Sequence, residues 1–93
     1  MNKIKLKKAR MNIDQLDQKI FNLVKKRTQI IRYMLSLKKS RKEIVDRKRN
    51  NEILEKIKNK SIKNKIDPKL TRRIWKAMIW GYVDFQRRNF KKK

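Results

Sequence analysis

The fold is decided by residues 6–39, which read LKKARMNIDQLDQKIFNLVKKRTQIIRYMLSLKK. Apolar residues recur there every seven positions and form two rows: Leu6, Ile13, Ile20 and Met34 in one, and Leu16, Leu23, Ile30 and Leu37 in the other. This spacing is typical of one face of a helix and not of a strand. Because neither Pro nor Gly interrupts the run, the sequence predicts one unbroken helix over about residues 6–39.

Positively charged residues interrupt this apolar face. Arg27 falls in the first row between Ile20 and Met34, and a third row on the same face contains Arg10 and Lys38. Charged groups are rarely placed beside a core without a partner, because desolvating each ion costs several kcal/mol. We therefore expect something anionic to lie against this face.

Composition narrows the class of protein. The 93 residues predict a single domain over residues 1–93, with 38% hydrophobic residues as a modest supply for a core. The absence of Cys and His excludes disulfides, the common zinc sites and His-based acid–base catalysis, so no cofactor or metal is expected. No apolar stretch approaches the ~18 residues of a membrane span, and no signal peptide is evident, so we expect a cytoplasmic, soluble protein without a membrane partner.

The net charge of +23 has two interpretations. A strongly basic surface attracts phosphates of any sequence and is typical of nucleic-acid-binding proteins. Lys, Asn and Ile, however, share AT-rich codons, and a biased genome would place lysines on solvated faces without any binding purpose. The second interpretation is preferred, and specific nucleic-acid binding is not expected. The lysines near both ends are expected to form basic tails.

Two further helices are expected after the first. Residues 40–45 show no helical period and are interpreted as a polar connection. Asp46 is a suitable N-cap for a second helix over about residues 46–61, and a lysine-rich turn follows. The pair Asp67-Pro68 is the clearest helix start in the chain and predicts a third helix over residues 68–89.

The third helix carries an apolar stripe that is expected to pack inward. Its members are Trp75, Met78, Ile79, Tyr82 and Phe85, and Gln86 continues the same stripe. Gly81 lies inside this helix at a cost of ~1 kcal/mol relative to Ala, which suggests close packing at that point. With no strand alternation, the fold class is all-α, with three helices of which the first is very long.

The length of the first helix predicts an intertwined homodimer. Its 34 residues extend about 50 Å, whereas a chain of this size has a radius of gyration near ~12 Å. A second copy is needed to cover the whole apolar face. Arg10 and Arg27 are ~25 Å apart along the axis, and Arg27 and Lys38 ~16 Å. Arg10 of the partner subunit could therefore complete a pocket with Arg27 and Lys38.

These residues resemble the all-helical chorismate mutases of the AroQ class, from the first helix to Gln86. The family's opening segment is matched by residues 9–17 (ARMNIDQLD), and its apolar run with a closing Arg by residues 23–27 (LVKKR). The lysine eleven positions further on is matched by Lys38, and the second-helix segment by residues 46–54 (DRKRNNEIL). Each motif is weak alone, and their joint register makes the resemblance specific.

The resemblance implies a role for each matched residue. Arg27 and the partner subunit's Arg10 would hold the two carboxylates of chorismate. Lys38 and Gln86 would face the ether oxygen of the breaking bond. Arg49 would add positive field, and the segment around Asp46 would border the ring hydroxyl. Choosing Arg47 in place of Arg49 would put the apolar residues of the second helix out of phase with the family pattern.

Three departures from the family pattern affect the implied pocket. Asn50 stands where the family has Glu, so a carboxylate is replaced by an amide that can still hydrogen-bond a hydroxyl. Tyr82 stands where a small polar residue is common. The connection after Lys38 is also about one residue shorter than usual. All three would reshape the substrate-binding region.

The activity that the resemblance implies is the rearrangement of chorismate to prephenate in phenylalanine and tyrosine biosynthesis. This intramolecular reaction requires no nucleophile, proton transfer or metal, which fits a chain without His and Cys. A monofunctional enzyme is expected, because the chain ends soon after Gln86. Two alternatives stay open: an isochorismate–pyruvate lyase on the same scaffold, and a non-catalytic basic helical protein that binds nucleic acid.

Overall fold

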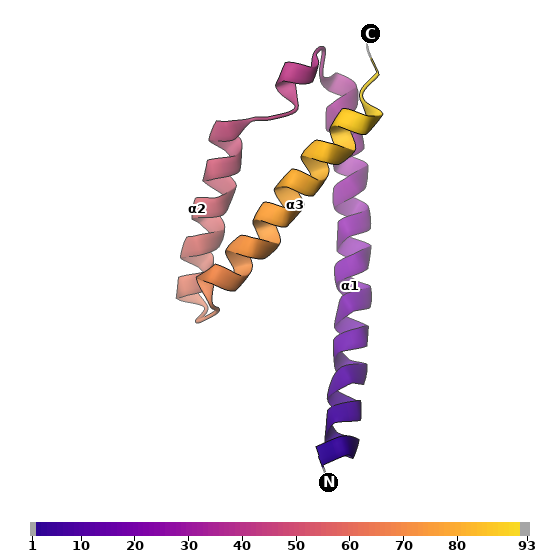
Figure 1. The fold of residues 1–93 in the computed structure, drawn as a ribbon, viewed down its shortest axis with the longest axis vertical. Coiled ribbons are helices and arrows are strands. Elements are labelled where there is room, and N and C mark those ends of the chain that lie inside the picture. Colours follow the sequence, from indigo (N-terminus) through magenta and orange to yellow (C-terminus); the bar gives the residue numbers. More distant parts are fainter. Residues whose placement is uncertain (1, 92–93) are drawn as a thin grey trace. The chain divides into compact units, whose positions relative to one another are not determined.

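The structure is a computed structural model that describes residues 2–91. It contains the helices α1 (Asn2–Leu37), α2 (Arg47–Lys63) and α3 (Pro68–Asn89), with the short 3₁₀ helix η1 (Arg41–Glu43) between α1 and α2 (Figure 1). No strand occurs among the described residues, so the predicted all-α class with three α-helices is confirmed. The chain divides between Tyr33 and Met34 into two compact units.

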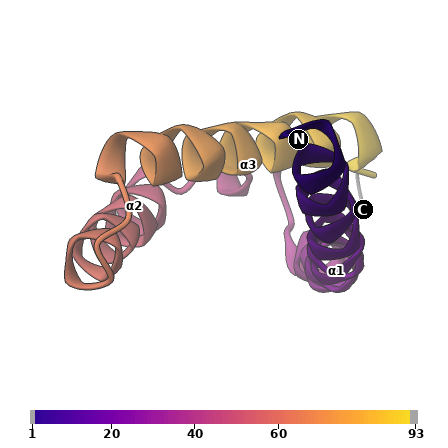
Figure 2. The ribbon, with the colours of Figure 1, turned by 90° about the horizontal axis from the view of Figure 1, so that it is seen from below.

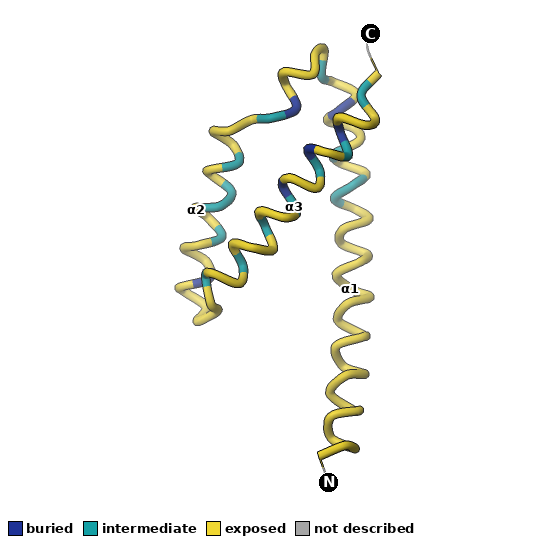
Figure 3. Tube along the Cα trace, in the orientation of Figure 1, coloured by how far each residue is buried: buried dark blue, intermediate teal, exposed yellow. Residues whose placement is uncertain are grey.

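The part of α1 before Met34 exposes its apolar rows to solvent. Leu23 is 62% exposed and Ile30 60% exposed, and Figure 3 shows the same for most of this helix. α1 begins at Asn2, so lysines that were predicted to form an N-terminal tail belong to the helix. Lysine is a good helix former, and nothing in this segment stops the helix earlier. Of the predicted C-terminal tail, Lys92 and Lys93 lie outside the described residues.

The end of α1 is set by a carboxylate further along the chain. Glu43 Oε2 accepts hydrogen bonds from the backbone N–H groups of Lys39 at 2.6 Å and Ser40 at 2.8 Å. These bonds hold the pKa of Glu43 below its ordinary value. They also satisfy N–H groups outside the helix, so α1 ends at Leu37 and not at the predicted residue 39.

The prediction that residues 40–45 carry no helical structure is wrong, because η1 occupies Arg41–Glu43. Ser40 and Glu43 have the three-residue spacing of a capping box, which marks the start of a helical turn. This signal was present in the sequence and could have located η1.

The predicted cap residues begin α2 and α3. Asp46 Oδ1 accepts a hydrogen bond from the Arg49 N–H at 3.0 Å, and Asp67 Oδ1 accepts one from the Lys69 N–H at 2.9 Å. α3 has the predicted bounds. α2 begins one residue later than predicted and runs to Lys63, beyond the predicted end at residue 61. The predicted lysine-rich turn is correspondingly shorter.

α2 and α3 are joined at the turn that follows α2, as the two views in Figures 1 and 2 show. The Ser61 hydroxyl lies 2.7 Å from the Thr71 hydroxyl and also donates to the carbonyl of Ile57 at 2.6 Å. Ser61 is buried, so these bonds satisfy a polar group that burial would otherwise penalise. The hydroxyl pair fixes the start of α3 against the end of α2.

The core lies in the unit that begins at Met34. Leu35 at the end of α1, Ile44 after η1 and Val83 of α3 form a buried cluster, against which Val45 and Phe90 pack. Buried and half-buried positions recur along α3 (Figure 3). The predicted inward stripe is half-buried or buried at each position, and Gln86 is buried. This cluster fixes the second half of α3 against the segment that follows α1.

Gly81 does not mark close packing within the chain, contrary to the sequence prediction. A Cβ at this position would meet no atom within 4 Å. The helix therefore bears the conformational cost of glycine without a contact that requires it.

We expect Gly81→Ala to raise the free energy of unfolding by about 0.5–1 kcal/mol, because alanine restricts the unfolded chain and fits the open space. Urea unfolding followed by circular dichroism measures the change. Ala77→Gly, at an exposed position of the same helix, is the matched control and should lower stability by a similar amount. A Gly81→Ala protein that is less stable than the parent would show that a second molecule packs against this position.

Candidate active site

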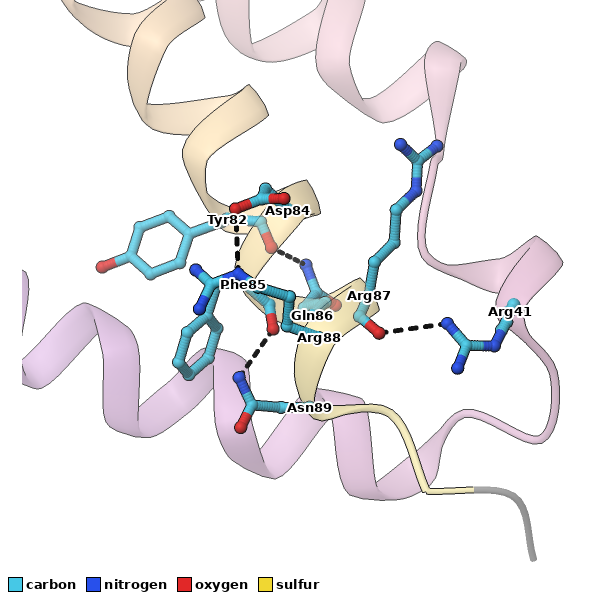
Figure 4. Close-up of polar contacts among 8 residues, drawn as sticks. All are labelled: Arg41, Tyr82, Asp84, Phe85, Gln86, Arg87, Arg88 and Asn89. Carbon is cyan, nitrogen blue, oxygen red and sulfur yellow. Dashed lines mark hydrogen bonds and ion pairs between the residues drawn. The ribbon is translucent and has the colours of Figure 1, made fainter.

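Lys38 and Gln86 form a direct hydrogen bond at the centre of the candidate site. The Lys38 ammonium donates to Gln86 Oε1 at 2.7 Å, although the residues are 48 positions apart in the chain. Gln86 is only 5% exposed, and its Nε2 donates to the carbonyl of Tyr82 at 3.2 Å (Figure 4). Packing of α3 against the end of α1 thus orients two polar groups that the sequence analysis assigned to one site.

The environment of Lys38 favours loss of the proton from its ammonium. Partial burial lowers the pKa of Lys38 below its ordinary value of 10.5, and the nearby carboxylates of Glu43 and Asp46 oppose this shift in part. The ammonium has therefore lost part of its hydration, which the hydrogen bond to Gln86 and the two carboxylates replace in part. Such a cation interacts strongly with an anionic ligand.

A pocket of about 820 Å³ opens beside Lys38 and is called here the cationic pocket. Its positively charged lining residues are Lys38, Arg41, Lys42, Arg47 and Arg87, and Val45 and Trp80 also line it. Two carboxylates, Glu43 and Asp46, complete the lining, and each accepts hydrogen bonds from backbone N–H groups. The lining carries more positive than negative groups, so this pocket suits an anion.

Arg41 is held in place by two contacts with the end of α3. Its Nη1 donates to the carbonyl of Arg87 at 3.0 Å (Figure 4), and its guanidinium carbon lies 5.4 Å from the centre of the Phe90 ring. The second contact is a cation–π interaction. Sequence reasoning missed Arg41, Lys42, Arg87 and Trp80 as pocket residues. Their proximity depends on packing between η1 and α3, for which the sequence contains no local signal.

The predicted residues at the start of α2 lie in different surroundings. Asp46 lines the cationic pocket, whereas the side chain of Arg49 is 60% exposed and lies 3.9 Å from the Glu52 carboxylate. Asn50 is half-buried, and its backbone N–H donates to the Asp46 carbonyl at 2.9 Å. Arg47, which the family register did not select, lines the pocket.

Tyr82 lies on a different side of α3 from the cationic pocket. Its ring makes an edge-on contact with Phe85, with 6.2 Å between the ring centres. Figure 4 shows the Tyr82 ring pointing away from the side chains of Arg41 and Arg87. Through its carbonyl, Tyr82 orients the Gln86 amide.

Arg10 and Arg27 belong to the unit that ends at Tyr33, whereas Lys38 and Gln86 belong to the other unit. Arg10 is exposed and Arg27 is half-buried. Their predicted role in holding carboxylates stays a prediction. Within residues 2–91, no group of three or more Asp, Glu, His or Cys side chains could hold a metal ion, and no helix is long and apolar enough to cross a bilayer.

The all-helical fold places an oriented ammonium–amide pair beside a cationic pocket, an arrangement that suits a small anion. The family model for Chorismate mutase type II matches residues 9–87, and the chain belongs to this family. Searches of curated proteins and of solved structures gave no match. The matched segment includes every site residue that the resemblance implied, from Arg10 to Gln86.

Proposed function

We propose that this protein is a chorismate mutase that converts chorismate to prephenate in phenylalanine and tyrosine biosynthesis. The hydrogen bond between Lys38 and Gln86 is the observation that carries the proposal, because it brings together the two side chains that the resemblance assigns to the ether oxygen. Family membership supports the choice of substrate.

The oriented pair has donor capacity left for a substrate. An ammonium has three N–H groups and a side-chain amide has two, and each residue uses one of them in the bonds described above. The remaining donors of Lys38 and Gln86 would bind the ether oxygen of chorismate, on which negative charge develops as the C–O bond breaks. Donors that are oriented before the reaction stabilise this charge without reorganisation.

The two carboxylates of chorismate require cations beyond Lys38. Arg27 and the partner subunit's Arg10 would hold them, since a guanidinium can form paired hydrogen bonds with a carboxylate. Asp46 and Asn50 would border the ring hydroxyl, and Arg49 would add positive field. Tyr82 would border the substrate beside Gln86, whose amide donates to the Tyr82 carbonyl. Holding the substrate in its reactive conformation then supplies the rest of the rate increase.

The proposal includes a homodimer in which α1 of one subunit packs along α1 of the other. The exposed apolar rows of α1 support it, with Leu16 51% exposed and Ile20 56% exposed. Burying each Leu or Ile contributes ~1.5–3 kcal/mol, so the repeated rows favour association strongly. A seven-residue apolar repeat is also the pattern by which helices pair lengthwise.

Turnover of chorismate tests the proposed function directly. The purified full chain is incubated with chorismate, and the loss of ultraviolet absorbance is followed with prephenate as the expected product. The same protein is incubated with isochorismate and assayed for pyruvate. Release of pyruvate from isochorismate without conversion of chorismate would replace the mutase assignment with that of the lyase.

We expect the activity to fall on the alkaline side at a pH below the ordinary lysine value of 10.5, because the pKa of Lys38 is lowered and catalysis requires its ammonium. The unfolded chain binds this proton more tightly than the folded chain. The Lys38 contribution to the free energy of unfolding therefore rises between the folded-state pKa and the ordinary value, opposite to the activity. A pH–rate profile measures the first effect.

Lys38→Arg is the control for the pH profile, because a guanidinium does not titrate in this range. Any activity that this variant retains should lack the alkaline fall assigned to Lys38. An unchanged fall in the variant would assign the titration to another group.

A further inference from the structure

Five residues form an exposed row along α3, here called the α3 track: Lys69, Arg73, Lys76, Trp80 and Arg87. They follow one another at intervals of four, three, four and seven positions, which places them on one face of a helix. Four of the five are cations. From Lys69 to Arg87, 18 positions further along the helix, the track extends about 27 Å.

Trp80 is the unusual member of the track. Tryptophan has the largest side chain of the standard amino acids, yet Trp80 is 44% exposed and lies between cations along the helix. Trp80 also lines the cationic pocket, together with Arg47 of α2. The track is therefore continuous with the pocket, and it places an aromatic ring where the two meet.

The carboxylates near the track accept hydrogen bonds from groups that do not belong to it. Asp84 is the one acid in the sequence of α3, and its Oδ2 accepts a hydrogen bond from Arg88 at 3.0 Å. In the pocket, Glu43 and Asp46 accept bonds from backbone N–H groups. The α3 track thus keeps its positive character.

Codon bias does not explain this arrangement. An AT-rich codon bias accounts for scattered lysines on solvated faces. The codon for Trp, however, is rich in G. Codon bias also gives no reason for cations to align with an exposed indole. Cations that follow a strand, combined with an aromatic side chain on which a base can stack, are typical of surfaces that bind single-stranded nucleic acid.

We propose that the α3 track and the cationic pocket bind single-stranded nucleic acid without sequence preference. The phosphates contact the lysines and arginines of the track, and one unstacked base enters the pocket and stacks on Trp80. The pocket volume of about 820 Å³ lies within the ~300–1,000 Å³ typical of ligand pockets. This inference does not depend on the proposed catalytic function.

Two triple variants test whether oligonucleotide binding depends on the α3 track or only on the net charge of the protein. The track variant is Lys69→Gln, Arg73→Gln and Lys76→Gln, and the control is Lys56→Gln, Lys60→Gln and Lys63→Gln on exposed positions of α2. Each removes three positive charges. Fluorescence anisotropy with labelled oligo(dT) and oligo(U) measures affinity over a range of salt concentrations.

The track variant should bind both oligonucleotides about tenfold more weakly at moderate salt, with a slope of log K against log salt smaller by about 2. The control should change affinity much less. Equal losses in the two variants would show that net charge alone drives binding and would overturn the proposal. The track variant should keep its chorismate mutase activity, so the two functions are tested separately.

Trp80 variants test base stacking. Trp80→Leu should weaken oligonucleotide binding by about fivefold or more, whereas Trp80→Phe should restore most of it. Inorganic polyphosphate, which has no bases, should bind the parent and Trp80→Leu equally. An equal effect of Trp80→Leu on polyphosphate and oligo(dT), or tighter binding of duplex than of single strands, would contradict stacking on this residue.

Discussion

Lys38→Ala should lower kcat/KM for chorismate by about 10²–10³-fold, the usual loss when one oriented donor to a developing oxyanion is removed. The variant also leaves Gln86 Oε1 without its 2.7 Å donor at a residue that is only 5% exposed. An unsatisfied buried acceptor costs ~1–3 kcal/mol, so the free energy of unfolding should fall as well. Ultraviolet assays of turnover and urea unfolding measure the two effects.

Lys39→Ala is the matched control for Lys38→Ala, because Lys39 is the adjacent lysine and its side chain is exposed. It removes the same charge and should leave kcat/KM within about threefold of the parent, since solvent screens an exposed charge. A Lys38→Ala enzyme with near-parental turnover at full helical content would remove Lys38 from the catalytic site.

The single variants Arg10→Ala and Arg27→Ala should each lose most of the activity. A mixture of the two variants, refolded so that mixed dimers form, should regain part of it. In the proposed dimer each site takes Arg27 from one subunit and Arg10 from the partner subunit. A mixed dimer of the two variants therefore contains one intact site and one site that lacks both arginines. Unfolding the variants together and refolding them should restore about one quarter of the parental sites, if subunits combine at random.

The control for this recovery is refolding each variant alone, which should restore nothing. A mixture of Arg27→Ala and Lys38→Ala serves as a second control, because both residues belong to the same subunit's site and no mixed dimer is intact. Full activity in Arg10→Ala would remove the cross-subunit contribution. Failure of the arginine mixture to recover, although mixed dimers form, would place both arginines in a single chain's site.

Much of the fold follows from residues whose effect is local. Asp67 and Pro68 begin α3 at the predicted position, because a capping carboxylate and a proline at the first helical position need only their immediate neighbours. Asp46 caps α2 for the same reason. The end of α1 lies two residues before the predicted position, because it depends on hydrogen bonds from Lys39 and Ser40 to the Glu43 side chain.

At the site, the residues selected by the family register agree only in part with the residues that the structure brings together. Register along the chain selected Lys38 and Gln86, and packing brings them within hydrogen-bond distance. It selected Arg49 over Arg47 at the start of α2, but only Arg47 lines the cationic pocket, and Arg49 lies near Glu52. The contact between Arg49 and the substrate stays a prediction.

By itself, the sequence determined the all-helical class, the family, the apolar rows of α1 and the caps of α2 and α3. Each of these depends on the spacing of residues along one stretch of chain. The tertiary structure alone decided that Arg41, Arg47 and Arg87 share one pocket, and that Gly81 has open space around it. These features depend on packing between segments distant in sequence, where the approach of one helix to another sets which side chains meet.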